Sequence, residues 1–216
     1  MKWLSMDSKF ATGMTQFINV ILLTLWFLIG CVPIITIGQS IIAAYRVTLD
    51  MTYYNDNYVG VTKTFWKAWK DNWKHGMLLE LIFGGILYAA WISWQLFDKT
   101  ANNPWYFLAI TIFLCLVVLI RGLYIFALEA RYENTLRQNL KNAKRIFVWY
   151  WKQTFAAIGC LALEFMLFFM ISSTLVLLGY IFKPVIAIFT ISAFASKIFR
   201  DLERKNGMLD EDEEYL

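Results

Sequence analysis

The chain has 216 residues, of which 59% are hydrophobic, 18% aromatic and only 17% charged, and its formal net charge is +4. Soluble domains average about 25% charged residues, so this composition excludes an ordinary water-soluble domain. The basic residues cluster beside apolar segments, which favours anionic lipid headgroups as their partner, and no nucleic-acid partner is expected.

Five apolar segments follow one another along the chain, at residues 14–42, 77–97, 105–128, 155–178 and 185–198. A helix needs about 20 apolar residues to cross a bilayer, and four of the five reach that length. The sequence therefore predicts an all-α fold, a polytopic membrane helical bundle of about five spans. Residues 1–206 form one integral-membrane domain, and 207–216 form an acidic, disordered tail. The first span is expected to be retained, because no small-residue cleavage site follows it.

The first apolar segment is interrupted by Gly30, Pro33 and Gly38. Proline removes one backbone hydrogen bond and clashes with the preceding turn, so a kink or break is expected near Cys31. Two interpretations stay open. The break is either a packing kink or part of a broken helix that lines a polar cavity, as in some transporters.

Lysine and arginine gather in alternate connectors, after the first span, after the third span and after residue 196. Cytoplasmic loops carry this excess, so the N-terminus is predicted outside and the C-terminus in the cytoplasm. The segment 185–198 is short for a full crossing, and Lys183 and Pro184 oppose its extension backwards. It either crosses the bilayer or forms a re-entrant or interfacial segment.

Two amphipathic helices are predicted in the basic connectors. In the first, Val61, Phe65, Trp69 and Trp73 recur every four residues beside a lysine stripe of Lys63, Lys67, Lys70 and Lys74. In the second, an apolar face of Tyr132, Leu136, Leu140, Ala143 and Phe147 adjoins Arg137, Lys141 and Lys144. Such helices either lie in the inner headgroup layer or form a cytoplasmic docking platform for a partner.

Three ionisable residues fall inside the apolar segments, namely Glu80, Arg121 and Glu164. Arg121 and Glu164 both lie about 15 Å from the cytoplasmic end of their spans at 1.5 Å per residue, so a bidentate ion pair is predicted, with Glu80 adding a second carboxylate. A structural clamp, a proton relay or part of a substrate path would each use such a cluster. Glu129 and His75 fall nearer the interface and are assigned no special role.

Motifs of enzyme chemistry are missing from the sequence. It contains no HExxH zinc motif, no GxSxG elbow and no GxxxxGK[ST] phosphate loop. Cys31, Cys115 and Cys160 are isolated within spans, and His75 is the one histidine. We therefore expect no enzyme, no metal site and no cofactor.

Four stretches resemble the YesL family of small multi-pass bacterial membrane proteins that carry a domain of unknown function. They are DSKF at Asp7–Phe10, CVPIITIGQSIIAAYRVTL at Cys31–Leu49, FWKAWKDNWKHG from Phe65, and ARYENTLRQNLKNA at Ala130–Ala143. The proline-containing segment is the most specific of them, and the resemblance covers nearly the whole chain except the acidic tail. It supplies no catalytic or binding residues.

The resemblance implies an accessory protein of the bacterial cytoplasmic membrane that assists ABC-type carbohydrate uptake, in lateral contact with permease subunits. The alternative is a small secondary transporter or channel in which Arg121, Glu80 and Glu164 line a polar path. Neither the solute nor the oligomeric state follows from the sequence.

Overall fold

The computed structural model describes residues 9–54, 60–99, 104–170 and 173–207. Within these ranges the chain forms α-helices and one short 3-10 helix and no strand, which confirms the all-α fold class. The elements in chain order are α1 (Lys9–Cys31), η2 (Ile34–Thr36), α2 (Ile37–Tyr53), α3 (Val61–Asp71), α4 (Trp73–Lys99), α5 (Trp105–Arg131), α6 (Leu136–Trp149), α7 (Trp151–Met170) and α8 (Ser173–Lys205).

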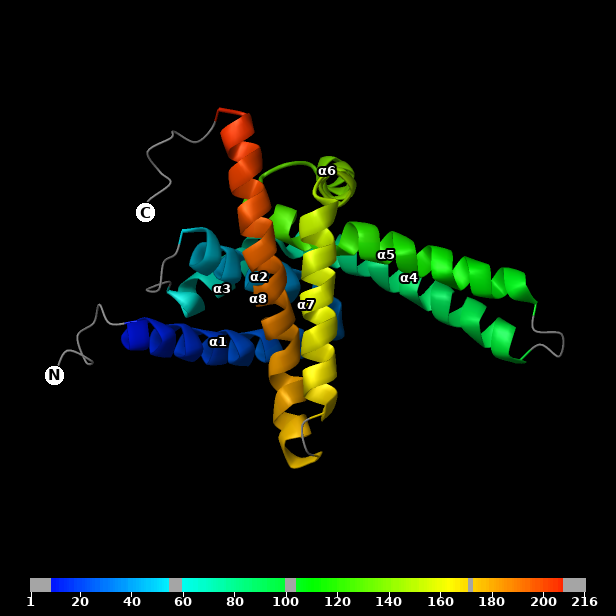
Figure 1. Cartoon of the computed structure of the whole chain (residues 1–216), viewed down its shortest axis with the longest axis horizontal. Coiled ribbons are helices and arrows are strands. Elements are labelled where there is room, and N and C mark those ends of the chain that lie inside the picture. Colours follow the sequence, from blue (N-terminus) through cyan, green and yellow to red (C-terminus); the bar gives the residue numbers. More distant parts are fainter. Residues whose placement is uncertain (1–8, 55–59, 100–103, 171–172, 208–216) are drawn as a thin grey trace.

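Helix α2 is the centre of the fold, and α1, α3, α4, α5 and α8 all contact it (Figure 1). Its side chains are small or apolar around most of its circumference, and Ile42, Ala43, Ala44 and Val47 are fully buried. A helix that is apolar all round is one that other helices surround. Two hydroxyl pairs tie α2 to α8, at 2.6 Å between Thr48 Oγ1 and Ser192 Oγ and at 2.7 Å between Thr52 Oγ1 and Ser196 Oγ.

The first predicted span, 14–42, is two helices. Helix α1 ends at Cys31 and α2 begins at Ile37, so the chain breaks completely around Pro33 and does not merely kink. The Thr36 hydroxyl lies 2.6 Å from the carbonyl oxygen of Gly30 and 2.7 Å from that of Pro33, and thereby satisfies acceptors that the break leaves open. The second half of the segment is consequently the buried helix α2.

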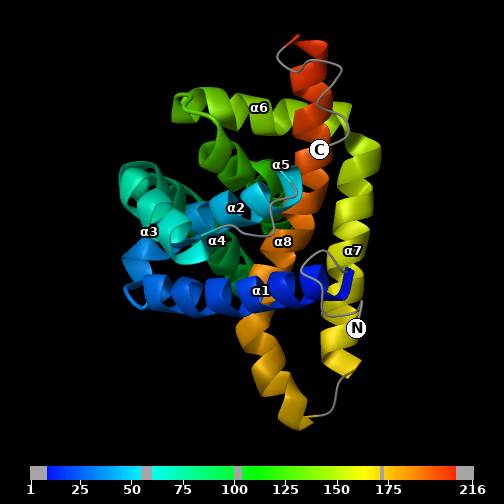
Figure 2. The ribbon, with the colours of Figure 1, turned by 90° about the vertical axis from the view of Figure 1, so that its left-hand side faces the viewer.

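Two long helix pairs extend from this centre. Helices α4 and α5 pack along each other and project to one side, whereas α7 and α8 form a second pair that runs across the first (Figures 1 and 2). Apolar and aromatic side chains cover the outer surface of both pairs, among them Leu87, Trp91, Phe113, Phe155 and Leu163, each at least half exposed.

Among the described residues, four helices are long and apolar enough to cross a membrane, over Gly13–Cys31, Trp73–Lys99, Trp105–Arg131 and Tyr180–Lys205. The pair formed by α6 and α7 is a fifth candidate, although its two helices meet at a bend of 92°. These helices indicate a membrane protein with four or five spans. Which segments cross, and in which direction, stays a prediction.

The last two predicted spans have different helix boundaries in the structure. Helix α7 ends at Met170, before the predicted end at residue 178, and residues 185–198 belong to the 33-residue helix α8. Pro184 lies inside α8 and does not stop it. Membrane helices tolerate proline because neighbouring helices and side chains satisfy the freed backbone groups. At 1.5 Å per residue α8 is about 50 Å long, so the shortness of 185–198 is no obstacle to crossing.

A polar cleft and a buried charge network

A cleft of about 950 Å³ opens between α2, α3, the start of α4 and the end of α5. These are the segments that the basic connectors predict to lie on the cytoplasmic side. Ten of its lining residues are basic or acidic by type, six basic and four acidic: Arg46, Lys63, Lys67, Lys74, His75 and Arg131, with Asp50, Asp71, Glu129 and Glu133.

Helix α3 forms one wall because its apolar face is anchored inside the protein. Phe65 is fully buried and Val61 is 2% exposed. The Trp69 indole donates to Ser40 Oγ at 3.2 Å, and the Trp26 indole donates to Thr62 Oγ1 at 2.9 Å. Helix α3 therefore packs on the α1–α2 break, and Val61 and Phe65 are buried by the protein itself. Whether α3 lies in the headgroup layer or forms a docking platform stays a prediction.

The start of α4 is held beside α2 by a contact between two glycines. A Cβ atom added at Gly38 would lie 2.2 Å from the carbonyl oxygen of Gly76, and one added at Gly76 would lie 2.5 Å from Gln39 Cα. Only glycine permits this backbone approach, as at other close helix crossings in membrane proteins. The crossing brings Lys74 and His75, just before Gly76, to the cleft.

Glu129 is the buried carboxylate of the cleft. Its side chain is 2% exposed, and Oε2 lies 2.9 Å from His75 Nδ1. Its other oxygen, Oε1, is buried without a hydrogen-bond partner among the described residues. A buried charged oxygen without a partner is uncommon in folded proteins, and such atoms often mark a site where a ligand, water or ion belongs.

Arg131 lines the cleft and forms an ion pair with Glu203 of α8. Arg131 Nε and Nη2 donate to the two carboxylate oxygens of Glu203, each at 3.0 Å. Tyr132 donates to Glu203 at 2.6 Å, Tyr53 also donates to it, and the Arg131 guanidinium lies 3.5 Å from the centre of the Tyr53 ring. One bidentate ion pair thus joins the ends of α2, α5 and α8.

The two tyrosines of this network titrate outside their ordinary range. Burial, with the hydrogen bond donated to Glu203, raises the pKa of Tyr53 to about 12. The same causes, burial first, raise the pKa of Tyr132. Because the neutral phenols are the donors, both tyrosines hold Glu203 in place throughout the neutral range.

The predicted cluster of Arg121, Glu80 and Glu164 does not assemble. Glu164 accepts a hydrogen bond from Thr190 of α8, and Glu80 Oε2 accepts one from the backbone N–H of Gly38 at 3.1 Å. In the described ranges no ion pair joins Arg121 to either carboxylate. The equal depth of Arg121 and Glu164 along their spans is not enough to bring them together, because α5 packs mainly on α4 and α6 while α7 packs on α8. The structure therefore does not contain the predicted ion pair between Arg121 and Glu164.

Glu80 has a different role from the predicted one. Its carboxylate lies at the N-terminus of α2, where the first backbone N–H groups of a helix lack partners and the helix dipole favours negative charge. Gly38, which makes the close crossing, also donates this hydrogen bond. Gly30 is also closely packed, since a Cβ atom added there would lie 2.6 Å from Ser40 Oγ. The two glycines of the first segment therefore serve helix packing, and Gly38 also donates to the Glu80 cap.

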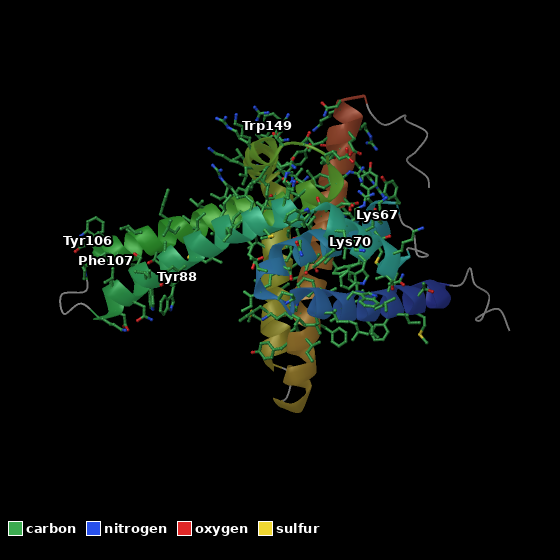
Figure 3. The ribbon with its side chains drawn as sticks, turned by 180° about the vertical axis from the view of Figure 1, so that it is seen from behind. Lys67, Lys70, Tyr88, Tyr106, Phe107 and Trp149 are labelled. Carbon is green, nitrogen blue, oxygen red and sulfur yellow. The ribbon has the colours of Figure 1, made fainter. Side chains whose placement is uncertain are left out.

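The basic residues of the two amphipathic segments remain on the surface. Lys63, Lys67 and Lys70 are exposed on α3, and Figure 3 shows Lys67 and Lys70 there. Trp73 and Lys74 are exposed but belong to the first turn of α4. Arg137, Lys141 and Lys144 are exposed on α6, whose opposite side buries Asn139, Ala143 and Ile146. The predicted face of α6 is thus partly right, because Ala143 is in it, but Tyr132 precedes the helix.

Sequence reasoning missed His75, Glu129, Arg131 and Glu203 as members of a site. Glu203 had a usable signal, since Ser192, Ser196, Phe199 and Glu203 continue one buried helical stripe. Glu129 had none, because its partner His75 lies 54 positions away. Among the described residues no three His, Cys, Asp or Glu side chains are grouped as metal ligands would be, and the three cysteines are free thiols.

Residues 19–94 match the model of a family described as "Protein of unknown function, DUF624". The match runs from α1 into α4, so it includes the helix break, α3 and two of the four stretches that resemble the YesL family, at Cys31–Leu49 and from Phe65. It does not include Glu129, α6 or α8, and it does not bear the YesL name. No curated protein and no solved structure matches the chain. Over roughly a third of its length the chain is thus similar to a family without an assigned function.

Proposed function

We propose that this chain is a non-enzymatic accessory protein of the bacterial cytoplasmic membrane, which docks a partner on the exposed basic faces of α3 and α6. The resemblance to the YesL family makes permease subunits of an ABC-type carbohydrate importer the partner to test. The C-terminus is proposed to lie in the cytoplasm, on the same side as these faces.

The observation that carries this proposal is that the two sides of α3 have different environments. Its apolar side is buried against α1 and α2, with Phe65 fully buried, while Lys63, Lys67 and Lys70 are exposed. The lysines are therefore not needed to hold the helix in the fold, and no ion pair within the described residues uses them. A cationic face of this kind suits an acidic partner surface and steers its approach.

Transport by the chain alone is the other candidate, and no contact within the described ranges favours it. Glu80 caps α2, Glu164 accepts a hydrogen bond from Thr190, and none of Glu80, Glu164 and Arg121 is among the residues that line the cleft. The geometry of Glu80 and Glu164 fits the structural interpretation of the intramembrane charges better than that of a polar path.

Affinity purification from native membrane tests the proposal. The unchanged protein should retain permease and ATPase subunits in stoichiometric amounts. The triple variant Lys63→Glu, Lys67→Glu, Lys70→Glu should retain at least about tenfold less, because each reversed charge opposes an acidic surface. The matched control is Lys99→Glu, a charge reversal at the exposed end of α4, predicted to lie on the other side of the membrane.

Two results would contradict docking. One is equal capture by the triple variant and the control. The other is solute flux catalysed by the purified protein alone in liposomes, which would favour a transporter.

A further inference from the structure

We propose that the acidic segment 210–214 of this chain docks on the basic face of α6 and covers it. The basic face consists of four exposed side chains, Arg137, Lys141, Lys144 and Arg145. The segment, of sequence DEDEE, belongs to the predicted acidic tail, of which residues 208–216 lie outside the described residues. The contact itself does not depend on the docking proposal, but its consequence, competition between tail and partner for α6, rests on that proposed function.

The basic face of α6 points away from the body of the protein. Side chains three, four or seven residues apart share one side of a helix, and this spacing aligns Arg137, Lys141, Lys144 and Val148, with Arg145 beside them. The opposite side is buried where α6 packs on α5. Among the described residues no ion pair uses any of the four cations. The face is therefore neither covered nor neutralised by the described part of the chain.

The tail begins beside α6. The hydroxyl of Tyr150, the residue after α6, donates a hydrogen bond to Asp201 of α8, and Lys205 Nζ lies 2.8 Å from the same carboxylate. Figure 2 shows the last turns of α8 beside the end of α6 that meets α7. Gly207, with φ of 65°, adopts the left-handed conformation that ends a helix. The chain thus leaves α8 close to the C-terminal end of α6.

The length of the tail matches the length of the basic face. An extended chain spans at most about 3.3–3.6 Å per residue, so the segment 210–214 can reach from about 10 to about 25 Å beyond Gly207. On α6, at 1.5 Å per residue, Arg145 lies about 8 Å and Arg137 about 20 Å from Tyr150. A tail that runs antiparallel to α6 consequently brings its acidic residues over the four cations.

The order of residue types matches as well. Counted from Gly207, the apolar residues Met208 and Leu209 come before five acidic residues, and the tail has no basic residue. Counted from Tyr150, Val148, which is 55% exposed, comes before the four cations. In the antiparallel direction apolar residues therefore meet Val148 and carboxylates meet cations.

Covalent attachment favours this segment over a separate acidic molecule. Single ion pairs on a protein surface are weak, because water screens them. A short flexible linker, however, gives a tethered segment an effective concentration of the order of millimolar. Several weak ion pairs made by the tail can thus hold it on α6 where a free acidic peptide would dissociate.

Carbodiimide cross-linking of the full chain in detergent tests the contact. The reagent joins a carboxylate to a lysine amine in contact with it, with loss of water, and mass spectrometry identifies the joined peptides. The tail should be joined to Lys141 or Lys144 and not to the lysines of α3. The yield should fall at least about fivefold between 0.1 and 1 M salt, because the Debye length falls from about 10 to 3 Å.

Two results of this experiment would overturn the proposal. One is equal cross-linking of the tail to α3 and to α6. The other comes from a mixture of chains with light and heavy isotopes, in which cross-links between a light and a heavy chain would assign the contact to the tail of a second copy.

Charge reversal tests the pairing without removing the lysines that report it. Arg137→Glu with Arg145→Glu, both exposed, should lower the yield at Lys141 and Lys144 at least about tenfold. Adding Asp210→Lys and Glu214→Lys should restore most of the yield, since three tail carboxylates remain to react. Lys63→Glu with Lys70→Glu on α3 is the matched control and should leave the yield on α6 unchanged. Full yield in the arginine variant, or a loss that the reversed tail does not restore, contradicts the docking of the tail.

A binding measurement tests whether the tail covers the face. A fluorescent peptide of residues 207–216 is added to the unchanged chain and to a full-length variant whose five tail carboxylates are amides (Asp210→Asn, Glu211→Gln, Asp212→Asn, Glu213→Gln, Glu214→Gln). The peptide should bind the amide variant at least about tenfold more tightly, because the tethered tail no longer competes. Equal binding to both chains, or binding to neither, would overturn the proposal. No partner is present in these experiments, so their failure is separable from failure of the docking proposal.

Discussion

The centre of the fold and the outer part of the α4–α5 pair are both rich in apolar and aromatic residues. At the centre other helices surround these residues, whereas on the outer part of the pair they are exposed. At the centre, α2 is surrounded by helices, and several of its polar side chains have partners on other helices, as Thr48 has in Ser192 of α8 and Ser40 in Trp69 of α3. At the far end of the pair Trp105 and Tyr106 are at least half exposed, and so is Tyr88 further inward on α4, as Figure 3 shows for Tyr106 and Tyr88. Figure 3 also labels Phe107 at that end.

The difference shows which part of an apolar sequence specifies a fold. Exposed apolar and aromatic residues on a spanning helix need only be compatible with lipid, and tyrosine and tryptophan near helix ends suit the interface. Residues at the centre must match one another atom by atom, because lipid offers no hydrogen bonds to a polar group left over. Changes at the centre should therefore be far more damaging than changes at the far end.

The largest effect is expected for Arg131→Met, which leaves Glu203 buried without its cation. Removal of one partner of a buried ion pair typically costs about 3–5 kcal/mol. The double change Arg131→Met, Glu203→Leu should recover most of that loss, because an apolar pair of similar volume is often close to neutral. Chemical or thermal unfolding in detergent measures both variants. A double variant as unstable as the single one would show that Arg131 acts through its tyrosine contacts instead.

Gly76→Ala should be nearly as severe. Its Cβ would lie 2.5 Å from the backbone N and Cα of Gln39, so α2 and α4 would have to separate, at a cost of about 3 kcal/mol. Gly84→Ala on the same helix is the control, since a Cβ there meets nothing within 4 Å. The loss of monodisperse protein in size-exclusion chromatography reports both variants. Equal behaviour of the two would mean that the α2–α4 crossing is not close in the protein.

Much of the fold could be predicted from sequence, and the site could not, for a physical reason. Helix type, the break near Pro33 and the amphipathic period of α3 depend on neighbours within about one or two turns, so they are readable locally. The partners of Glu80, Glu129 and Arg131 lie on other helices, and they depend on which helices pack together. The depth of a residue along its span does not tell which helices are neighbours. Arg121 and Glu164 do not pair because α5 and α7 pack on different helices.

The effect of Pro184 and the surroundings of α3 also depend on which helices pack together. The sequence predicts a helix boundary at Pro184, yet α8 continues through it, since neighbouring helices and side chains in a membrane protein can satisfy the backbone groups that a proline frees. The burial of Phe65 against α1 and α2 could not be predicted, because a face of Phe65 and Trp69 is equally suited to lipid and to the protein interior. Only the position of α1 and α2 distinguishes the two.

The tyrosines at the centre give a pH prediction. The folded-state pKa of Tyr53 is raised from 10.0 to about 12, by burial first and then by its hydrogen bond to Glu203. A raised pKa means that the stabilisation is complete below pH 10 and is lost as pH rises from 10 towards 12. Thermal unfolding between pH 8 and 12 should show that loss, and Tyr53→Phe should diminish it. Tyr88→Phe, at an exposed position near the middle of α4, should leave the profile unchanged.

The smallest effect is a coupling expected to be absent. If Arg121 and Glu164 were partners, the double change to alanine would be less harmful than the sum of the two single changes. Because Glu164 accepts from Thr190 and no ion pair joins it to Arg121, the two effects should add within about 0.5 kcal/mol. Thr190→Val with Glu164→Gln provides the matched cycle that should show coupling, since these two side chains do touch. A coupling energy above about 1 kcal/mol between Arg121 and Glu164 would instead place them in contact, and α5 and α7 would then have to pack together within the membrane.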